Sequence, residues 1–211
     1  MNFGFLVFPQ VEELDFIGPW EMATMWKQVA AGPENCLVVA QTMSPVTCAK
    51  GLSINPHADF DTCPQLDYLL VPGGQGTRTE VDNARLIEFV SRQAVGCKAV
   101  LSVCTGAFIL HAAGLLSGRR ATTHWSFLDR LRARGDVTVV EERFTRDDKV
   151  WCAAGVSAGI DLTLAFIADT AGEDAAGKVQ FWSEYYPSSA AYGSYTRHAQ
   201  APAYVRSTPV I

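Results

Sequence analysis

The sequence lacks the segments that mark secreted and membrane proteins. Its first residues, Met1–Phe8, have no basic stretch and are interrupted by Pro9, so they do not form a signal peptide. The longest helix-like apolar stretch, 156–168, contains Asp161 and is too short to span a bilayer. We therefore expect a cytoplasmic protein that does not have a membrane as its partner.

An excess of basic residues is also missing. The sequence has 17 Lys and Arg against 22 Asp and Glu, which gives a formal net charge of −5. No dense basic run overrides this balance, so nucleic acid is not expected as a partner. The arginines at positions 130, 132 and 134 are interpreted as a solvated helix face whose charge is offset by Asp129 and Asp136.

Closely spaced cysteines and phosphate-binding glycine loops are absent as well. The six cysteines are scattered and contain no C-x-x-C pair, which argues against a disulfide framework and against a zinc site. They are typical of free thiols in a reducing compartment. The sequence has no G-x-x-x-x-G-K-[ST] and no G-x-G-x-x-G motif, so it does not predict a nucleotide-binding loop.

The sequence does contain an alternation of short apolar runs with helix-forming segments. This alternation predicts right-handed βαβ units and an α/β fold, with helices on both faces of a mostly parallel sheet. Strands are predicted at 3–8, 36–42, 68–71, 98–103, 137–140 and 149–153, a small hairpin at 46–54, and helices at 17–30, 83–94, 105–113, 124–134, 156–171 and 173–185.

Cys104 stands between the predicted strand 98–103 and the helix that follows it. At such an elbow a side chain points out of the sheet towards the unpaired N–H groups of the first helical turn. Those groups and the helix dipole are expected to stabilise a thiolate, the nucleophilic form of the thiol. Gly106 and Ala107 are small enough to let a substrate approach. An inert core thiol is the alternative, but the position favours a reactive cysteine.

Asp15 and the Gly73-Gly74 loop are expected at the same sheet edge, because ligand sites in such sheets lie at the carboxyl ends of the strands. Asp15 suits either of two roles. It is a cap or anion in the first helical turn, or it is a proton carrier beside Cys104, and in that case desolvation by Phe16 and Trp20 raises the pKa of Asp15. The loop is either a tight turn or, together with the Thr105 N–H, an anion hole for charge that develops on a substrate.

A histidine suited to activate the thiol is not evident. The helix carries His111 away from Cys104, and His124 is better interpreted as a structural hydrogen-bonding residue. Thr105 directly follows the cysteine. A Cys–Asp pair assisted by the Thr105 hydroxyl therefore fits the sequence better than a Cys–His–acid triad.

These motifs resemble the ThiJ/PfpI superfamily, whose members share a flavodoxin-like three-layer sandwich and a nucleophile-elbow cysteine. Threonine after the cysteine, where the peptidase-like and chaperone-like branches commonly have histidine, is similar to the isocyanide hydratase branch. The pattern also occurs in the amidase-like sensor domains of AraC-type regulators. The segments that carry the resemblance are Asp15–Glu21, Val71–Gly74, Ser102–Ala107, Ala121–Trp125 and Gly155–Asp161.

The resemblance implies a hydratase that adds water to an organic isocyanide and gives an N-substituted formamide through a Cys104 thioimidate, without metal or organic cofactor. It implies Asp15 as general acid/base and Thr105 as a hydroxyl contact near the sulfur. A nearly apolar isocyanide would suit an aromatic wall. The expected substrate-binding residues are Gly73, Gly74, Gln75, Phe16, Trp20, Gly155 and Val156.

The competing interpretation is a ligand- or redox-sensing domain. AraC-type regulators attach a DNA-binding domain after the sandwich, whereas here a short Tyr/Pro-rich stretch follows, which favours an enzyme. We expect one domain over 1–186 and an extension over 187–211 that packs on the domain or on a dimer partner. Pro187, Pro202, Pro209, Tyr192, Tyr195 and Tyr204 mark this extension, and Phe181, Trp182, Tyr185 and Tyr186 precede it. Their aromatic surface predicts a homodimer.

Overall fold

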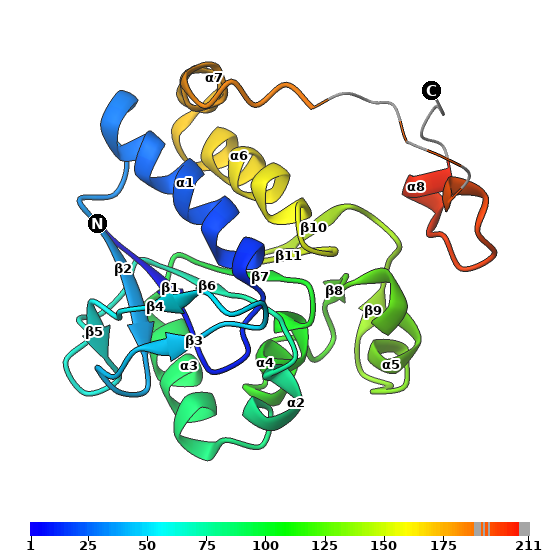
Figure 1. Cartoon of the computed structure of the whole chain (residues 1–211), viewed down its shortest axis with the longest axis horizontal. Helices are drawn as coiled ribbons and strands as arrows, with labels where there is room; N and C mark the ends of the chain where they lie inside the picture. Colours follow the sequence, from blue (N-terminus) through cyan, green and yellow to red (C-terminus); the bar gives the residue numbers. More distant parts are fainter. Residues whose placement is uncertain (188–190, 192, 194, 207–211) are drawn as a thin grey trace.

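A seven-stranded sheet forms the middle layer of the computed structural model, which describes residues 1–187, 191, 193 and 195–206 (Figure 1). The strand order is β10-β11-β7-β6-β1-β2-β5, and every neighbouring pair is parallel except β10 and β11. The strands are β1 (Asn2–Leu6), β2 (Asn35–Ala40), β5 (Ala58–Asp59), β6 (Tyr68–Val71), β7 (Ala99–Val103), β10 (Phe144–Asp147) and β11 (Val150–Ala153). Two small pairs lie outside this sheet: β3 (Val46–Thr47) with β4 (Ser53–Ile54), and β8 (Arg120–Ala121) with β9 (Thr138–Val139).

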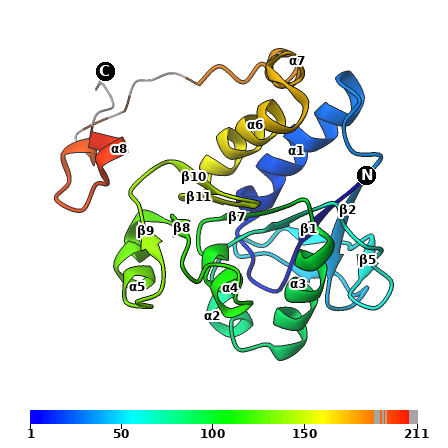
Figure 2. The ribbon, with the colours of Figure 1, turned by 180° about the vertical axis from the view of Figure 1, so that it is seen from behind.

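Helices cover both faces of the sheet, as Figures 1 and 2 show from opposite sides. One layer contains α1, α6 and α7, which pack on one another, and the other contains α2, α3 and α4. None of the helices in the described part of the chain is long and apolar enough to cross a membrane. The helices are α1 (Glu13–Val29), α2 (Thr77–Glu80), α3 (Ala84–Gly96), α4 (Gly106–Ala112), α5 (Leu128–Arg132), α6 (Ala158–Ala171), α7 (Glu173–Trp182) and α8 (Ala203–Arg206), with 3-10 turns at Trp125–Phe127 and Tyr195–Arg197. This architecture confirms the predicted flavodoxin-like α/β sandwich with a mostly parallel sheet.

An aromatic cluster fixes the α1/α6 layer on the sheet. The Phe166 ring of α6 contacts Tyr68 of β6 at 5.0 Å, Trp151 of β11 at 5.8 Å, Phe3 of β1 at 6.1 Å and Trp26 of α1 at 6.2 Å between ring centroids. All five side chains are buried. Burial of one such side chain contributes about 1.5–3 kcal/mol, and edge-to-face ring pairs add to that. The cluster therefore fixes the C-terminal part of α1 and the middle of α6 on the sheet.

Most predicted elements are present with shifted ends. Helix α1 begins at Glu13 and not at Ile17, so Asp15 lies in its first turn. The predicted strand at 137–140 is found as β9, but it pairs with β8 outside the main sheet. The single helix predicted at 124–134 is a 3-10 turn followed by α5. Five short elements were not predicted: β5, β8, β10, α2 and α8. They have two to four residues each and too little apolar periodicity to be recognised.

The described part of the C-terminal extension packs against the domain of its own chain. Tyr204 of α8 packs partly buried against the main core, whereas Tyr195 is 82% exposed. Trp125 shares a cavity wall with Tyr195 and Val205. Tyr192 and Pro209, which were part of the expectation for this segment, lie outside the described residues. The division at 186/187 and the packing of the extension on a dimer partner stay predictions.

Candidate functional site

Cys104 occupies a strained elbow directly after β7. Its φ is +56°, in the left-handed region that side chains other than glycine rarely adopt, and such strain is maintained only where neighbouring groups hold it. The Cys104 N–H donates to the carbonyl oxygens of Ala154 (2.9 Å) and Ala153 (3.1 Å) at the end of β11. Its carbonyl oxygen accepts a hydrogen bond from the Thr123 hydroxyl at 2.7 Å. The predicted elbow is therefore present and is held from both sides.

Asp15 reaches Cys104 from the first turn of α1. The Asp15 side chain has no exposed surface, and its Oδ2 accepts a hydrogen bond from the Gly73 N–H at 2.9 Å. The carboxyl also interacts by a hydrogen bond with the Cys104 thiol. Among the described residues, Asp15 Oδ1 has no hydrogen-bond partner although it is buried. A buried, partly unsatisfied carboxyl beside a thiol is a functional arrangement more often than a capping one.

Burial sets the protonation of this pair. Loss of solvent is the largest cause that raises the pKa of Asp15 to about 8, and it outweighs the hydrogen bonds from Gly73 and Cys104. Burial, with the negative charge of Asp15, also raises the pKa of the Cys104 thiol above its ordinary value. Backbone hydrogen bonds from Thr105 and Val156 act in the opposite direction and are weaker. The raised Asp15 pKa agrees with its expected role as a proton carrier. The N–H groups at the elbow favour the thiolate, as expected, but desolvation of the thiol outweighs them.

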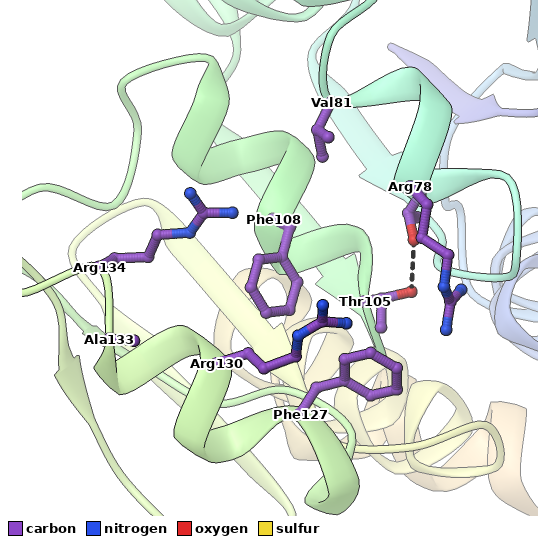
Figure 3. A pocket seen from close by; sticks show the side chains of 9 residues that line it. Arg78, Val81, Thr105, Phe108, Phe127, Arg130, Ala133 and Arg134 are labelled. Atoms are coloured by element: carbon purple, nitrogen blue, oxygen red, sulfur yellow. Dashed lines mark hydrogen bonds between the residues drawn. The ribbon is translucent and has the colours of Figure 1, made fainter.

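Thr105 ties the elbow to the glycine loop. Its Oγ1 accepts a hydrogen bond from the Gly74 N–H at 3.1 Å and lies 3.0 Å from Thr77 Oγ1, a bond drawn in Figure 3. The hydroxyl also interacts with the Cys104 sulfur, as the resemblance implied. Because the Gly73 and Gly74 N–H groups both bond to side chains, they position Asp15 and Thr105. They are not free to form the anion hole expected from the sequence.

Gly73 and Gly106 lie so close to neighbouring atoms at the elbow that neither position has room for a side chain. A Cβ on Gly73 would lie 2.5 Å from the Thr105 nitrogen and 2.9 Å from Asp15 Oδ2. A Cβ on Gly106 would lie 2.2 Å from the Val71 carbonyl oxygen. Ala107 is completely buried. Gly106 and Ala107 thus serve the packing of α4 against β6, which corrects the expectation that they admit a substrate.

The remaining expected substrate-binding residues separate into two groups. Phe16 is buried beside Asp15, and Val156, with a φ of +40°, directs its N–H towards the Cys104 sulfur. By contrast, Trp20 packs against Phe5 and stacks on His57, over β1 and β2. The structure does not bring Trp20 to the cysteine.

Gly155 and Gln75 complete the expected set. Gly155 packs against the His124 ring, since a Cβ there would lie 2.4 Å from His124 Cδ2. Gln75 is exposed in the turn before α2. Neither residue has a hydrogen bond to Cys104 or Asp15 among the described contacts, so their contact with a substrate stays a prediction.

The histidines have structural roles. His124 Nδ1 accepts a hydrogen bond from the Ser126 N–H at 3.2 Å and lies 2.8 Å from Ser126 Oγ, and burial lowers the pKa of this histidine. His111 pairs with Asp136 at 2.8 Å. All four histidines belong to the described part of the chain, and none has a hydrogen bond to Cys104 there. The site is a Cys–Asp pair with a threonine hydroxyl, not a Cys–His–acid triad.

A cavity of about 360 Å³ borders Thr105 on the side of α2, α4 and α5 (Figure 3). No motif in the sequence predicted this cavity. Its walls come from three helices that are far apart in the sequence, and the arginines of α5 were interpreted as a solvated face. The hydrogen bond from the Thr123 hydroxyl to the elbow was not predicted either. The available signal for it was the pair of polar residues Thr122-Thr123 directly after β8, both of which are buried.

Known proteins are similar to this chain over most of its length. An isonitrile hydratase from Pseudomonas putida is 38% identical over 187 residues, which cover 89% of this chain and 79% of the relative. The transcriptional regulator CdhR from Pseudomonas aeruginosa is 28% identical over 179 residues, 84% of this chain and 53% of the regulator.

Among solved structures, a ThiJ/PfpI family protein from Pseudomonas syringae superposes with a TM-score of 0.83 at 35% identity, over 97% of this chain and 82% of that one. DJ-1beta from Drosophila melanogaster has a TM-score of 0.77 over 88% of this chain and 98% of its own, but at 16% identity it shows the fold alone. The sequence model described as the DJ-1/PfpI family matches residues 2–169. The chain belongs to the DJ-1/PfpI family.

Proposed function

We propose that the protein is an isonitrile (isocyanide) hydratase, which adds water to R–N≡C and releases the formamide R–NH–CHO. The observation that carries this proposal is the buried Asp15–Cys104 pair, in which a carboxyl with a pKa of about 8 contacts a thiol at a nucleophile elbow. The 38% identity to the Pseudomonas putida isonitrile hydratase supports it.

In the first step, the sulfur attacks the terminal carbon of the isocyanide while that carbon receives a proton. The electron pair comes from sulfur, and the Asp15 carboxyl donates its proton to the carbon. The thiol proton passes to Asp15 in the same step, so the carboxyl is protonated again when the thioimidate has formed. The product is the thioimidate R–N=CH–S–Cys104. Because R–N≡C is uncharged, a site of two neutral groups takes it up without the cost of desolvating an ion.

In the second step, the Asp15 carboxyl donates its proton to the thioimidate nitrogen. The carboxylate so formed accepts a proton from water as the water oxygen adds to the thioimidate carbon. Cleavage of the C–S bond then gives the formamide and returns a proton to the Cys104–Asp15 pair. The N–H groups of Thr105 and Val156 stabilise negative charge on the leaving sulfur, because they already bond to it in the resting site. Phe16 supplies an apolar contact for R, and Gly73 and Gly74 hold Asp15 and Thr105 in place.

An alkyl isocyanide tests the proposal directly. Purified protein incubated with cyclohexyl isocyanide should produce N-cyclohexylformamide, detected by its formyl proton in NMR spectra, faster than buffer alone. A heat-denatured sample controls for non-enzymatic hydration. Absence of formamide from a panel of alkyl and aryl isocyanides would refute the assignment.

A sensing domain is the second candidate, favoured by the similarity to the regulator CdhR. In that case Cys104 would bind or sense a ligand without turnover. Multiple-turnover kinetics separate the two functions: an enzyme produces many equivalents of formamide for each protein chain, whereas a sensor produces at most one.

We also expect a homodimer. Phe181, Trp182 and Tyr186, at and just after the end of α7, are each more than 60% exposed, and such adjacent aromatic surface usually marks an interface. Light scattering at micromolar concentration should give about twice the chain mass of 22.9 kDa. A mass near that of one chain would reject the dimer.

A further inference from the structure

The cavity beside Thr105 combines positive charge with aromatic walls. Arg78, Arg130 and Arg134 border it together with Phe108 and Phe127 (Figure 3). Its volume of about 360 Å³ lies within the usual range for small-molecule sites. No step of the proposed hydration uses these three arginines.

The charge of the three arginines is not neutralised locally. Among the described residues, none of them has a carboxylate oxygen within 4.0 Å. The two carboxylates expected to offset the arginines of α5 have other partners. Asp129 pairs with Arg132 at 2.8 Å, and Asp136 pairs with His111 at 2.8 Å.

Arg132, the last residue of α5, differs from Arg130 and Arg134. It pairs with Glu141 at 2.8 Å in addition to Asp129, and it does not border the cavity. The three arginines are exposed, as expected, but Asp129 and Asp136 do not offset the charge of Arg130 and Arg134. The ion-paired Arg132 does not border the cavity, whereas Arg130 of α5 and Arg134 of the turn after α5 border it without a carboxylate partner.

Aromatic rings hold the guanidinium groups in place. Arg78 and Arg130 lie over the Phe127 ring at 5.2 and 5.7 Å from its centroid, and Arg134 lies over Phe108 at 5.6 Å. A guanidinium stacked on a ring keeps the N–H groups of its edge available, and its planar fork matches a carboxylate. Arg78 uses part of this capacity on the Gly74 and Gln75 carbonyl oxygens. Within the described part of the chain, Arg130 and Arg134 have no hydrogen-bond or ion-pair partner, which makes them the principal anion-binding groups.

We propose that this cavity binds a small organic anion, a carboxylate carried on an apolar body. The carboxylate bonds to the edges of Arg130 and Arg134, and the body contacts the Phe108 and Phe127 rings, with Val81 on the wall. The apolar walls distinguish this ligand from a free inorganic anion, which would leave them in contact with water. The site reaches the Thr105 hydroxyl, so its occupant lies one residue from Cys104. Binding does not depend on the proposed hydration reaction.

Calorimetric titration of the full chain with phenylacetate tests this site, and phenylacetamide is the uncharged analogue of the same shape. We expect phenylacetate to bind and phenylacetamide to bind at least about tenfold more weakly, because it lacks the charge-assisted hydrogen bonds. The double variant Arg130→Gln/Arg134→Gln should weaken phenylacetate binding by about tenfold or more. The matched control is Arg132→Gln, on the same helix but paired with Asp129 and Glu141, which should leave the dissociation constant within about twofold at physiological ionic strength.

Three outcomes would overturn the proposal. They are equal binding of phenylacetate and phenylacetamide, unchanged phenylacetate binding in the double variant, and binding of inorganic phosphate as tight as that of phenylacetate. The last outcome would show an anion site that does not use its apolar walls. The arginines are exposed, so both variants should retain the wild-type circular dichroism spectrum.

Discussion

Replacement of Cys104 by alanine is expected to abolish formamide production while the protein stays folded. The sulfur forms the only covalent bond between enzyme and substrate in the proposed reaction, and loss of a covalent nucleophile lowers turnover by about 10³-fold or more. The fold should tolerate the change because the elbow is held by main-chain bonds to Ala153 and Ala154 and by the Thr123 hydroxyl, none of which uses the thiol.

Serine at position 104 makes the test stricter. Cys104→Ser keeps the size of the side chain and a hydroxyl that donates to Asp15, but a serine hydroxyl is a far weaker nucleophile. We expect the same loss of activity, measured as the initial rate of formamide formation. Cys36→Ser is the matched control: Cys36 is a half-buried thiol at the start of β2, away from the elbow, and this variant should keep wild-type rates. Near-wild-type activity in Cys104→Ala would exclude the nucleophile assignment.

The elbow and the strands that carry it were predictable because their signals are local. A β-branched run, then a cysteine, then helix-forming residues specify β7, Cys104 and α4 within about fifteen residues. Alternation of strands and helices also predicted that Asp15, the Gly73-Gly74 loop and Cys104 meet at one sheet edge. The hydrogen bonds from Gly73 to Asp15 and from Gly74 to Thr105, the residue after Cys104, confirm this.

The protonation of the site was only half predictable. The helix-terminal N–H groups near Cys104 exist, but the thiol pKa depends on how completely the surrounding chain excludes water, which the local sequence does not contain. The prediction that Trp20 lines the substrate site was wrong for a similar reason. Its position five residues after Asp15 did not reveal that the helix turns it towards Phe5 and His57. The arginine-lined cavity is formed by residues from three helices that are separate in the sequence, so no single motif predicts it.

Replacement of Asp15 by asparagine is the second prediction with a large effect. Asparagine keeps the shape and can accept the Gly73 N–H bond, but it cannot transfer a proton. Turnover should therefore fall by about 10²–10⁴-fold, the usual contribution of general acid–base catalysis. Formamide formation by Asp15→Asn at the pH of the wild-type optimum measures this loss.

The stability of the same variant distinguishes a catalytic carboxyl from a capping one. The pKa of Asp15 is raised from an ordinary value of 3.8 to about 8 on folding. Between these values the unfolded chain ionises Asp15 while the folded chain keeps the proton, so this group lowers wild-type stability as pH rises. The dependence is at most about 1.4 kcal/mol for each pH unit in that window, and it is absent in Asp15→Asn.

Urea unfolding of wild type and Asp15→Asn at pH 5 and pH 8 isolates the contribution of Asp15 to the free energy of unfolding. The contributions of other titrating groups cancel when the two proteins are compared. We expect Asp15→Asn to gain stability relative to wild type by several kcal/mol between these two pH values, while its activity is lost. A capping Asp15 requires the reverse result. An ionised carboxylate in the first turn of α1 would stabilise the helix N-terminus, so its removal would cost most at pH 8 and would leave turnover intact.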